Sequence, residues 1–183
     1  AKEFGINTNF EVSLSIDTEG KNINAVEGKV LIPKGLKVVG IKDGNSIVNF
    51  WVDRPKYNNG EIVWSGIIPG GYNGGKGYIY SMILSSQNNG NLEITAKDIN
   101  ALMNDGLGTK SNVKVNSIKL SIKDGSVNNS GFIKMEDKDI PETFSPVLAK
   151  DQNIFNNNYF ISFYTQDKKS GIDHYEIAEK IGF

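Results

Sequence analysis

Apolar and polar residues alternate with a period of two through most of the first 122 residues. The clearest run alternates four apolar side chains with Glu and Ser: Phe10, Val12, Leu14 and Ile16. Successive side chains on a strand point to opposite faces, so this run predicts a strand with one buried face and one solvent-exposed face. The same reasoning predicts further strands over residues 23–32, 36–41, 47–52, 61–68, 78–84, 91–95 and 113–122. Short strands at this spacing predict an all-β, antiparallel sandwich or barrel.

Turn and loop residues set the expected ends of these strands. The strand over 47–52 is expected to stop before Arg54-Pro55, since proline cannot donate to a central ladder. The strand over 61–68 is expected to stop before the glycine-rich loop 69–75. Residues 96–102 are expected to be irregular or a single helical turn, and a change of phase near Ser117 predicts a β-bulge.

The sequence changes character after residue 122. Residues 123–143 are rich in glycine, asparagine and charge, which predicts a linker, with Phe132-Ile133 as a candidate edge strand. Residues 144–183 carry two further predicted strands, at 159–165 and 172–177. About 40 residues without a cross-link rarely fold alone, so this part is cut short, packs on the first domain, or is completed by another chain. The expected organisation is a domain over 1–122, a linker over 123–143 and a partial module over 144–183.

Charge and composition argue against several classes of function. The chain has 20 basic and 21 acidic residues, so no long-range field draws it to nucleic acid or an anionic membrane. It has no cysteine and a single histidine, His174, which disfavours thiolate chemistry, a Ser-His-Asp triad and a multi-histidine zinc site. No run approaches the roughly 18 apolar residues of a spanning helix. We therefore expect no enzymatic activity.

The N-terminal residue gives an expectation about location. The sequence starts at Ala1 without an apolar leader, so either a signal peptide has been removed or the sequence begins at a chosen boundary. Chains that are rich in glycine and asparagine and lack cysteine are common among exported bacterial proteins. We expect a secreted or cell-surface protein.

Four segments together resemble cohesin modules. They occur in order as VSLSIDTEGKNINAVEGKVLIP (12–33), KVVGIKDGNSIVNFWVD (37–53), EIVWSGIIPGGYNGGKGYIYSMIL (61–84) and NDGLGT (104–109). The resemblance extends from about residue 8 to residue 122. It implies a jelly-roll β-sandwich that binds a protein partner, such as a dockerin, or a polysaccharide through one sheet face. The later run DKKSGIDHYEI (167–177) resembles the first hairpin of an Ig-like extracellular module.

The resemblance and the aromatic residues suggest a binding surface. The resemblance places Asn49, Trp51 and Asp53 on the partner-facing side. Phe50 and Trp51 are neighbours on one strand, so one is expected to be buried and the other exposed. Trp64 is expected in the core, whereas an exposed aromatic strip is expected to include Trp51 or Tyr57. The candidate ligand-binding residues are Asn49, Trp51, Asp53, Tyr57 and Tyr72.

Three further motifs resemble ligand sites in part. Asp105, in a glycine loop, is a weak calcium candidate, since one carboxylate is too few unless the fold adds Asp17, Glu19 or Asp43. The run Gly70–Gly77 lacks the Gly-Lys-Ser/Thr ending of a phosphate loop. His174, beside Asp173 and Glu176, lacks further metal ligands nearby. No cofactor is expected, with calcium as the one alternative.

These observations favour a non-catalytic extracellular binding or adhesion module that engages a protein or a polysaccharide. One alternative is a structural subunit of a surface layer or filament, in which residues 159–165 pair with a sheet edge of a neighbour. A second alternative is a carbohydrate-binding module of a larger hydrolase.

Overall fold

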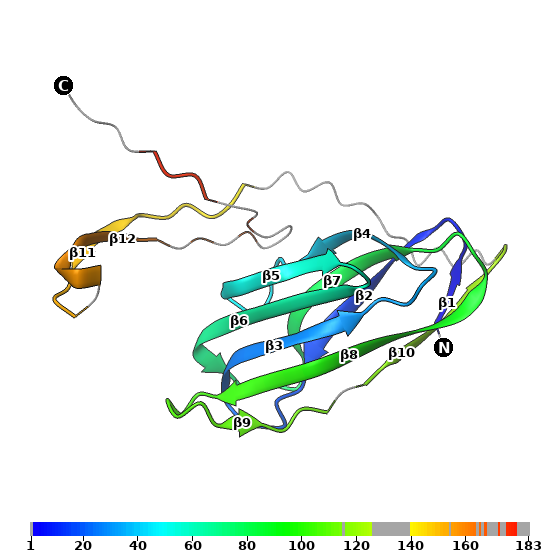
Figure 1. Ribbon diagram of the computed structural model, residues 1–183, viewed down its shortest axis with the longest axis horizontal. Helices are drawn as coiled ribbons and strands as arrows, with labels where there is room; N and C mark the ends of the chain where they lie inside the picture. The colour runs from blue at the N-terminus through cyan, green and yellow to red at the C-terminus, as the bar shows by residue number, and fades with distance from the viewer. Residues whose placement is uncertain are drawn as a thin grey trace.

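The computed structural model describes residues 2–114, 116–125, 140–153, 155–163, 165, 167, 172 and 175–178. Its strands form two facing sheets and a separate hairpin (Figure 1). The strands are β1 (Lys2–Gly5), β2 (Asn9–Ile16), β3 (Ile23–Leu31), β4 (Lys37–Lys42), β5 (Phe50–Asn58), β6 (Glu61–Tyr72), β7 (Gly77–Ser85), β8 (Gly90–Met103), β9 (Lys110–Ser111), β10 (Ile118–Lys123), β11 (Val147–Lys150) and β12 (Tyr159–Ser162). The predicted all-β sandwich is confirmed.

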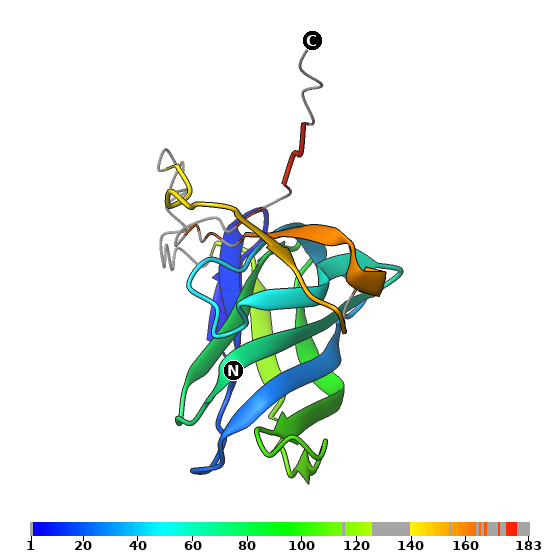
Figure 2. The ribbon, with the colours of Figure 1, turned by 90° about the vertical axis from the view of Figure 1, so that its left-hand side faces the viewer.

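The two sheets differ in size and in strand order. The larger has the order β1-β10-β8-β3-β6-β5, with β9 added beside β8, and the smaller has the order β2-β7-β4. All pairs are antiparallel except β1 with β10. Figure 2 shows the sheets as two layers of a sandwich. Each sheet can therefore bury one face against the other and leave its second face to solvent.

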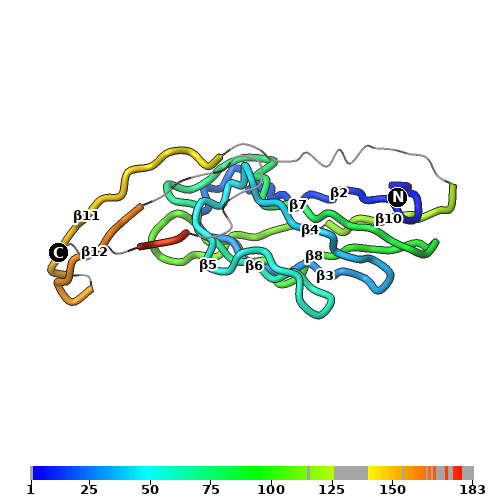
Figure 3. Tube along the Cα trace, turned by 90° about the horizontal axis from the view of Figure 1, so that it is seen from above, coloured from blue at the N-terminus to red at the C-terminus, as the bar shows by residue number. Residues whose placement is uncertain are grey.

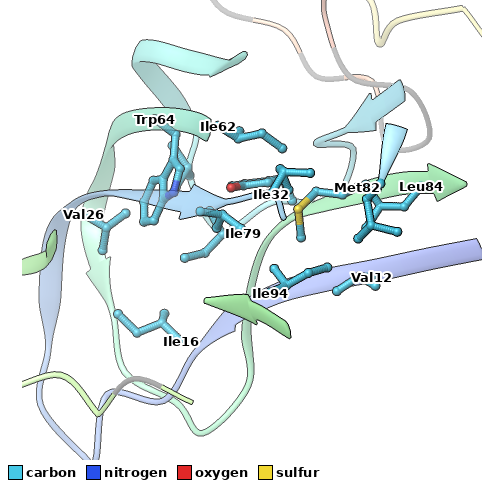
Figure 4. Close-up of a cluster of buried hydrophobic side chains, with 14 of the residues drawn as sticks. Val12, Ile16, Val26, Ile32, Ile62, Trp64, Ile79, Met82, Leu84 and Ile94 are labelled. Atoms are coloured by element: carbon cyan, nitrogen blue, oxygen red, sulfur yellow. The ribbon is translucent and has the colours of Figure 1, made fainter. Parts of the chain in front are cut away.

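The inward-facing residues of both sheets form one hydrophobic core. Trp64 of β6 is 1% exposed and meets the ring of Tyr80 of β7 edge-on, with centroids 6.1 Å apart. Figure 4 shows side chains from opposite sheets pointing toward each other, among them Val26, Ile62 and Leu84. The expectation that Trp64 is a core residue is confirmed. Among the described residues, every buried apolar side chain falls between Phe4 and Ile122.

Specific contacts close the sandwich at both lateral edges. At one edge, Phe4 of β1 stacks on Phe10 of β2, with ring centroids 4.1 Å apart. At the other edge, Arg54 of β5 donates two hydrogen bonds to Asp43, which directly follows β4. Nε donates to Oδ2 at 2.8 Å, and Nη2 donates to Oδ1 at 2.9 Å. A guanidinium matches a carboxylate with two parallel hydrogen bonds, so this pair fixes both distance and orientation. Each contact joins the edge strands of the two different sheets.

Several predicted strand ends were wrong, and each has a local cause. β5 begins at Phe50 and continues through Pro55, because it is an edge strand with two irregularities in its pairing to β6. β6 continues through the predicted glycine loop to Tyr72, with Gly70 and Gly71 at positive φ inside the strand. Proline and glycine therefore did not end these strands.

The second half of the domain also departs from prediction. β8 runs to Met103 through the segment predicted to be irregular or helical, and it absorbs the local irregularity at Asp98, whose φ is 53°. The predicted strand over 113–122 is shorter, since β10 begins at Ile118 and no strand covers Ser117, where a bulge was predicted. β1 was not predicted. It adds to the sheet in parallel to β10, a long-range pairing that local alternation does not reveal.

The described residues from 140 to 178 form a C-terminal arm. Its strands β11 and β12 pair only with each other, and the turn between them includes the 3₁₀ segment Phe155–Asn157. Figures 1 and 3 place this hairpin beyond one end of the sandwich. In the segments that flank the hairpin, three rings pack against one another: Phe144 before β11, and Phe163 and Tyr175 after β12.

The prediction for this arm was only partly right. The strand predicted over 159–165 ends at Ser162, and β11 was missed. The described residues of the strand predicted over 172–177 are not in a strand. Phe132-Ile133 and His174 lie outside the described residues.

Within the described part of the chain, no helix has the length and hydrophobicity to cross a bilayer.

Candidate functional site

The outer face of the larger sheet carries an apolar row that crosses four strands. Phe50 of β5 lies opposite Ile67 of β6, Ile67 lies opposite Ala25 of β3, and Ala25 lies opposite Leu102 of β8. Phe50 is 59% exposed and Ile67 is 40% exposed, while Ala25 and Leu102 are half-buried. In Figure 1 the strands β5, β6, β3 and β8 form the front layer, and no described segment crosses in front of them. We call these four residues the apolar row.

A polar row runs beside the apolar row, one pleat further along the strands. It consists of Asp53, Ser65, Glu27 and Asn100, in register across the same four strands. Ser65 Oγ donates to Asp53 Oδ2 at 3.2 Å, and Asn100 Nδ2 donates to Glu27 Oε1 at 3.0 Å. These side-chain hydrogen bonds hold the two carboxylates in place on the sheet. We call these four residues the carboxylate row.

A third row contains the ion pairs of this face. Lys29 Nζ lies 2.8 Å from Asp98 Oδ2 and 3.9 Å from Glu61 Oε2. The hydrogen bond to Asp98 and its negative charge raise the pKa of Lys29, and the same contact lowers the pKa of Asp98. Both groups are therefore charged across the neutral range. Exposed pairs of this kind contribute little to stability, so the row mainly fixes the charge pattern of the surface.

Two glycines keep the inner side of this sheet compact. A Cβ on Gly28 would collide with the side chain of Ile99, and a Cβ on Gly66 would collide with that of Val48. The core side chains of neighbouring elements thus fill the space beneath β3 and β6. This close packing lets both strands stay paired while their outward residues form the rows.

The structure separates the predicted binding residues. Asp53 lies on the outer face, in the carboxylate row, and Asn49 is exposed just before β5. Trp51 is half-buried and faces the core, since it lies opposite Gly66 and packs against the core cluster. Tyr72 also packs against the core cluster, with its ring close to Gly74 and Gly77. The structure does not gather the five predicted residues on one surface.

One part of the aromatic expectation was right, the opposite facing of Phe50 and Trp51. Phe50 and Trp51 do point to opposite faces, but Phe50 is the exposed member of the pair. Tyr57 is 42% exposed. It lies opposite the buried Ile62, which puts it on the core side of the sheet at its free edge. Tyr57 therefore does not join the apolar row.

Sequence reasoning missed Ile67, Ala25 and Leu102 as surface residues. The segment around Ile67 reads Gly-Ile-Ile-Pro, where two adjacent isoleucines hide which one faces solvent. The available signal was the position of Trp64: if Trp64 is in the core, then Ile68 is inward and Ile67 is outward.

The calcium candidate Asp105 lies in a turn that uses its carboxylate. Asp105 Oδ1 accepts from the Leu107 backbone N–H at 2.9 Å. Hydrogen bonds from the Thr109 side chain and from this N–H lower the pKa of Asp105. Asp43 is engaged by Arg54, and Asp17 accepts from the Glu19 N–H. Within the residues that the structure describes, no three His, Cys, Asp or Glu side chains gather in a way that could hold a metal ion.

Comparison with known proteins gives a result for the fold. No protein-family model matches the chain, and no curated protein sequence matches it either. Solved structures do match. One is a cohesin module from a family 33 glycoside hydrolase of Clostridium perfringens, with a TM-score of 0.56 and 12% identity, covering 68% of this chain and 92% of that one.

Two further matches agree with the first. A non-cellulosomal cohesin from the archaeon Archaeoglobus fulgidus has a TM-score of 0.58 and 13% identity, covering 68% of this chain and 88% of that one. A type I cohesin–dockerin complex from Clostridium thermocellum gives a TM-score of 0.52 and 17% identity, covering 67% of this chain and 94% of that one. The sandwich has the cohesin fold. The predicted jelly-roll β-sandwich of the cohesin type is thereby confirmed as a fold.

Proposed function

We propose that this protein is a non-catalytic binding module that engages a protein partner through the outer face of β8, β3, β6 and β5. The single observation that carries this proposal is the apolar row, in which Phe50 and Ile67 are exposed on a continuous strip across four strands. Exposed apolar side chains that lie in contiguous patches mark interaction surfaces, whereas isolated ones do not. The strip is bordered by ordered polar groups, as in the core and rim of a protein interface.

The comparisons suggest what kind of partner to test first. Several of the matched structures are cohesins in complex with dockerins, including a type I complex from Clostridium thermocellum and a scaffoldin cohesin from Acetivibrio cellulolyticus. A dockerin-like partner would cover the apolar row with apolar side chains. Lysine or arginine side chains of the partner would meet Asp53 and Glu27, whose free oxygens remain available beside their internal hydrogen bonds.

The same proposal includes location and domain organisation. A module of this type would act outside the cell, in a secreted or surface-anchored bacterial protein, as the composition suggests. The binding domain would span residues 1–122, followed by a linker over 123–143 and the start of an Ig-like module over 144–183. The confinement of the described apolar core to Phe4 through Ile122 supports the first of these boundaries.

A binding assay with matched variants tests the proposal. The wild-type chain, Ile67→Asp and Val39→Asp are each titrated with a panel of calcium-loaded dockerin modules by isothermal calorimetry. Ile67 and Val39 are both exposed aliphatic residues, at 40% and 48%, but Val39 lies on β4 of the other sheet. We expect Ile67→Asp to weaken binding at least about 30-fold, the loss typical of an interface hot spot, and Val39→Asp to leave it unchanged.

Two results would count against the proposal. Equal binding by wild type and Ile67→Asp would remove the apolar row from the interface. Failure of every dockerin, together with retention of the chain on insoluble polysaccharides, would support a carbohydrate-binding module instead. Circular dichroism of each variant shows that the sandwich is still folded.

A further inference from the structure

The hairpin β11–β12 of the C-terminal arm presents a second unpartnered face. Leu148 lies opposite Ile161, and Lys150 lies opposite Tyr159, so these four side chains share one face. Leu148, Ile161 and Tyr159 are between 55% and 69% exposed. A two-stranded hairpin is marginally stable by itself in water and gains stability when a face packs on another element. We call these four residues the arm face.

We propose that the arm face docks onto the apolar row and carboxylate row of a second copy of this chain. The inference rests on the proposed function in one respect, since it uses the same outer face of the sandwich. It assigns that face an additional partner, the arm of another copy. The chain would then associate head to tail.

The row spacing of the two surfaces is the first argument. On the arm face, an apolar pair, Leu148 and Ile161, is followed two residues along the strands by Lys150 and Tyr159. On β3, β6 and β8, the apolar row is followed two residues along by the carboxylate row. Two residues of a strand span about 6.6 Å in both cases. Sheets that pack face to face can therefore place both rows in contact at once.

Charge complementarity is the second argument, and it selects one orientation. When Leu148 and Ile161 cover Phe50 and Ile67, the most exposed pair of the apolar row, the hairpin can point either way along the strands. Only one of these directions brings Lys150 over Asp53. In the structure, Lys150 Nζ lies 5.0 Å from the centre of the Tyr159 ring, which keeps this charge on the arm face.

The position of the hairpin indicates that the outer face bound by the arm belongs to a second copy of the chain. In Figures 1 and 3 the hairpin lies beyond one end of the sandwich and does not cover the outer face of its own chain. A contact between two different surfaces of identical chains is heterologous, so it extends into chains or closes into rings. A hairpin buries little area, so we expect weak association that becomes visible toward about 1 mM.

Sedimentation equilibrium of the full chain tests the inference. The wild-type average mass is expected to rise with concentration, while Leu148→Asp and Ile67→Asp alone remain monomeric. An equimolar mixture of these two variants should form a dimer and stop there, because one retains an intact arm face and the other an intact outer face. Val39→Asp is the control and should associate like the wild type.

A charge exchange keeps the test valid if Leu148→Asp disturbs the hairpin. Lys150→Glu should weaken association at least about fivefold, and adding Asp53→Lys in the same chain should restore it. A wild type that stays monomeric throughout, a mixture that fails to form dimers, or a charge exchange without rescue would each overturn the inference. In sedimentation velocity, a wild type that sediments faster than Leu148→Asp at a constant monomer mass would show that the arm binds its own sandwich, which also overturns the inference. None of these failures would alter the calorimetric result for dockerins, so the two proposals fail separately.

Discussion

The sandwich and the C-terminal arm both contain strands with apolar side chains but bury these side chains very differently. In the sandwich, Leu84 of β7 is 0% exposed, whereas Leu148 of β11 in the arm is 66% exposed. The sandwich has a second sheet on which to place its apolar side chains, and the hairpin in this structure has none. An apolar strand thus contributes to stability only when another layer covers its apolar face.

A leucine-to-alanine substitution in each region should give the largest difference in the free energy of unfolding. Leu84→Ala removes a fully buried side chain and should lower the free energy of unfolding by about 2–5 kcal/mol. Leu148→Ala should change it by less than about 0.5 kcal/mol. Urea unfolding followed by tryptophan fluorescence reports on the sandwich alone, since both tryptophans, Trp51 and Trp64, lie there.

Equal losses of stability in these two variants would contradict the comparison. They would mean that the arm is a cooperative part of the same folding unit as the sandwich.

Removing the Arg54–Asp43 contact at the sandwich edge should lower the free energy of unfolding by an intermediate amount. Asp43 is 9% exposed and is held by two hydrogen bonds from Arg54. Arg54→Met leaves this carboxylate buried without its partner, which should cost about 1–3 kcal/mol. The double variant Asp43→Asn/Arg54→Met should lose less than the sum of the single changes in urea unfolding. Strict additivity would show that the pair does not join the two edge strands energetically.

One substitution inside the core is expected to stabilise the sandwich by a smaller amount. The hydroxyl of Tyr80 is buried and has no hydrogen-bond partner among the described residues, and burial raises the pKa of this group. Tyr80→Phe removes an unpaired polar group, so it should raise the free energy of unfolding by about 1 kcal/mol. Tyr175→Phe in the arm, where the hydroxyl donates to the Thr165 carbonyl, is the matched control and should leave the sandwich unchanged. A clear loss of stability in Tyr80→Phe would mean that its hydroxyl is satisfied.

Much of the sandwich could be predicted because its strands follow local rules. Alternation located β2, β3, β4 and β7 to within a residue or two. It did not locate β1, whose position depends on pairing with β10 at the far end of the domain. It also ended two strands too early, before Arg54-Pro55 and before the loop 69–75, where long-range pairing of β5 and β6 overrides the local signal.

The candidate site was harder to predict than the fold. Asp53 lies on the outer face of β5, but Phe50 rather than Trp51 is the exposed aromatic residue of this strand. The members of the apolar row come from four strands that are distant in sequence, so only the register of the sheet shows that they are aligned. The binding role of Asn49, Trp51, Asp53, Tyr57 and Tyr72 stays a prediction.

Hydrogen exchange of the chain with and without a bound dockerin module tests the central claim most directly. If the outer face of the larger sheet binds the partner, peptides that contain Phe50, Ile67, Ala25 and Leu102 should exchange more slowly in the complex, and those from β2 and β4 should not change. Slower exchange confined to β2 and β4, or to the loop at Asn73, would contradict the claim.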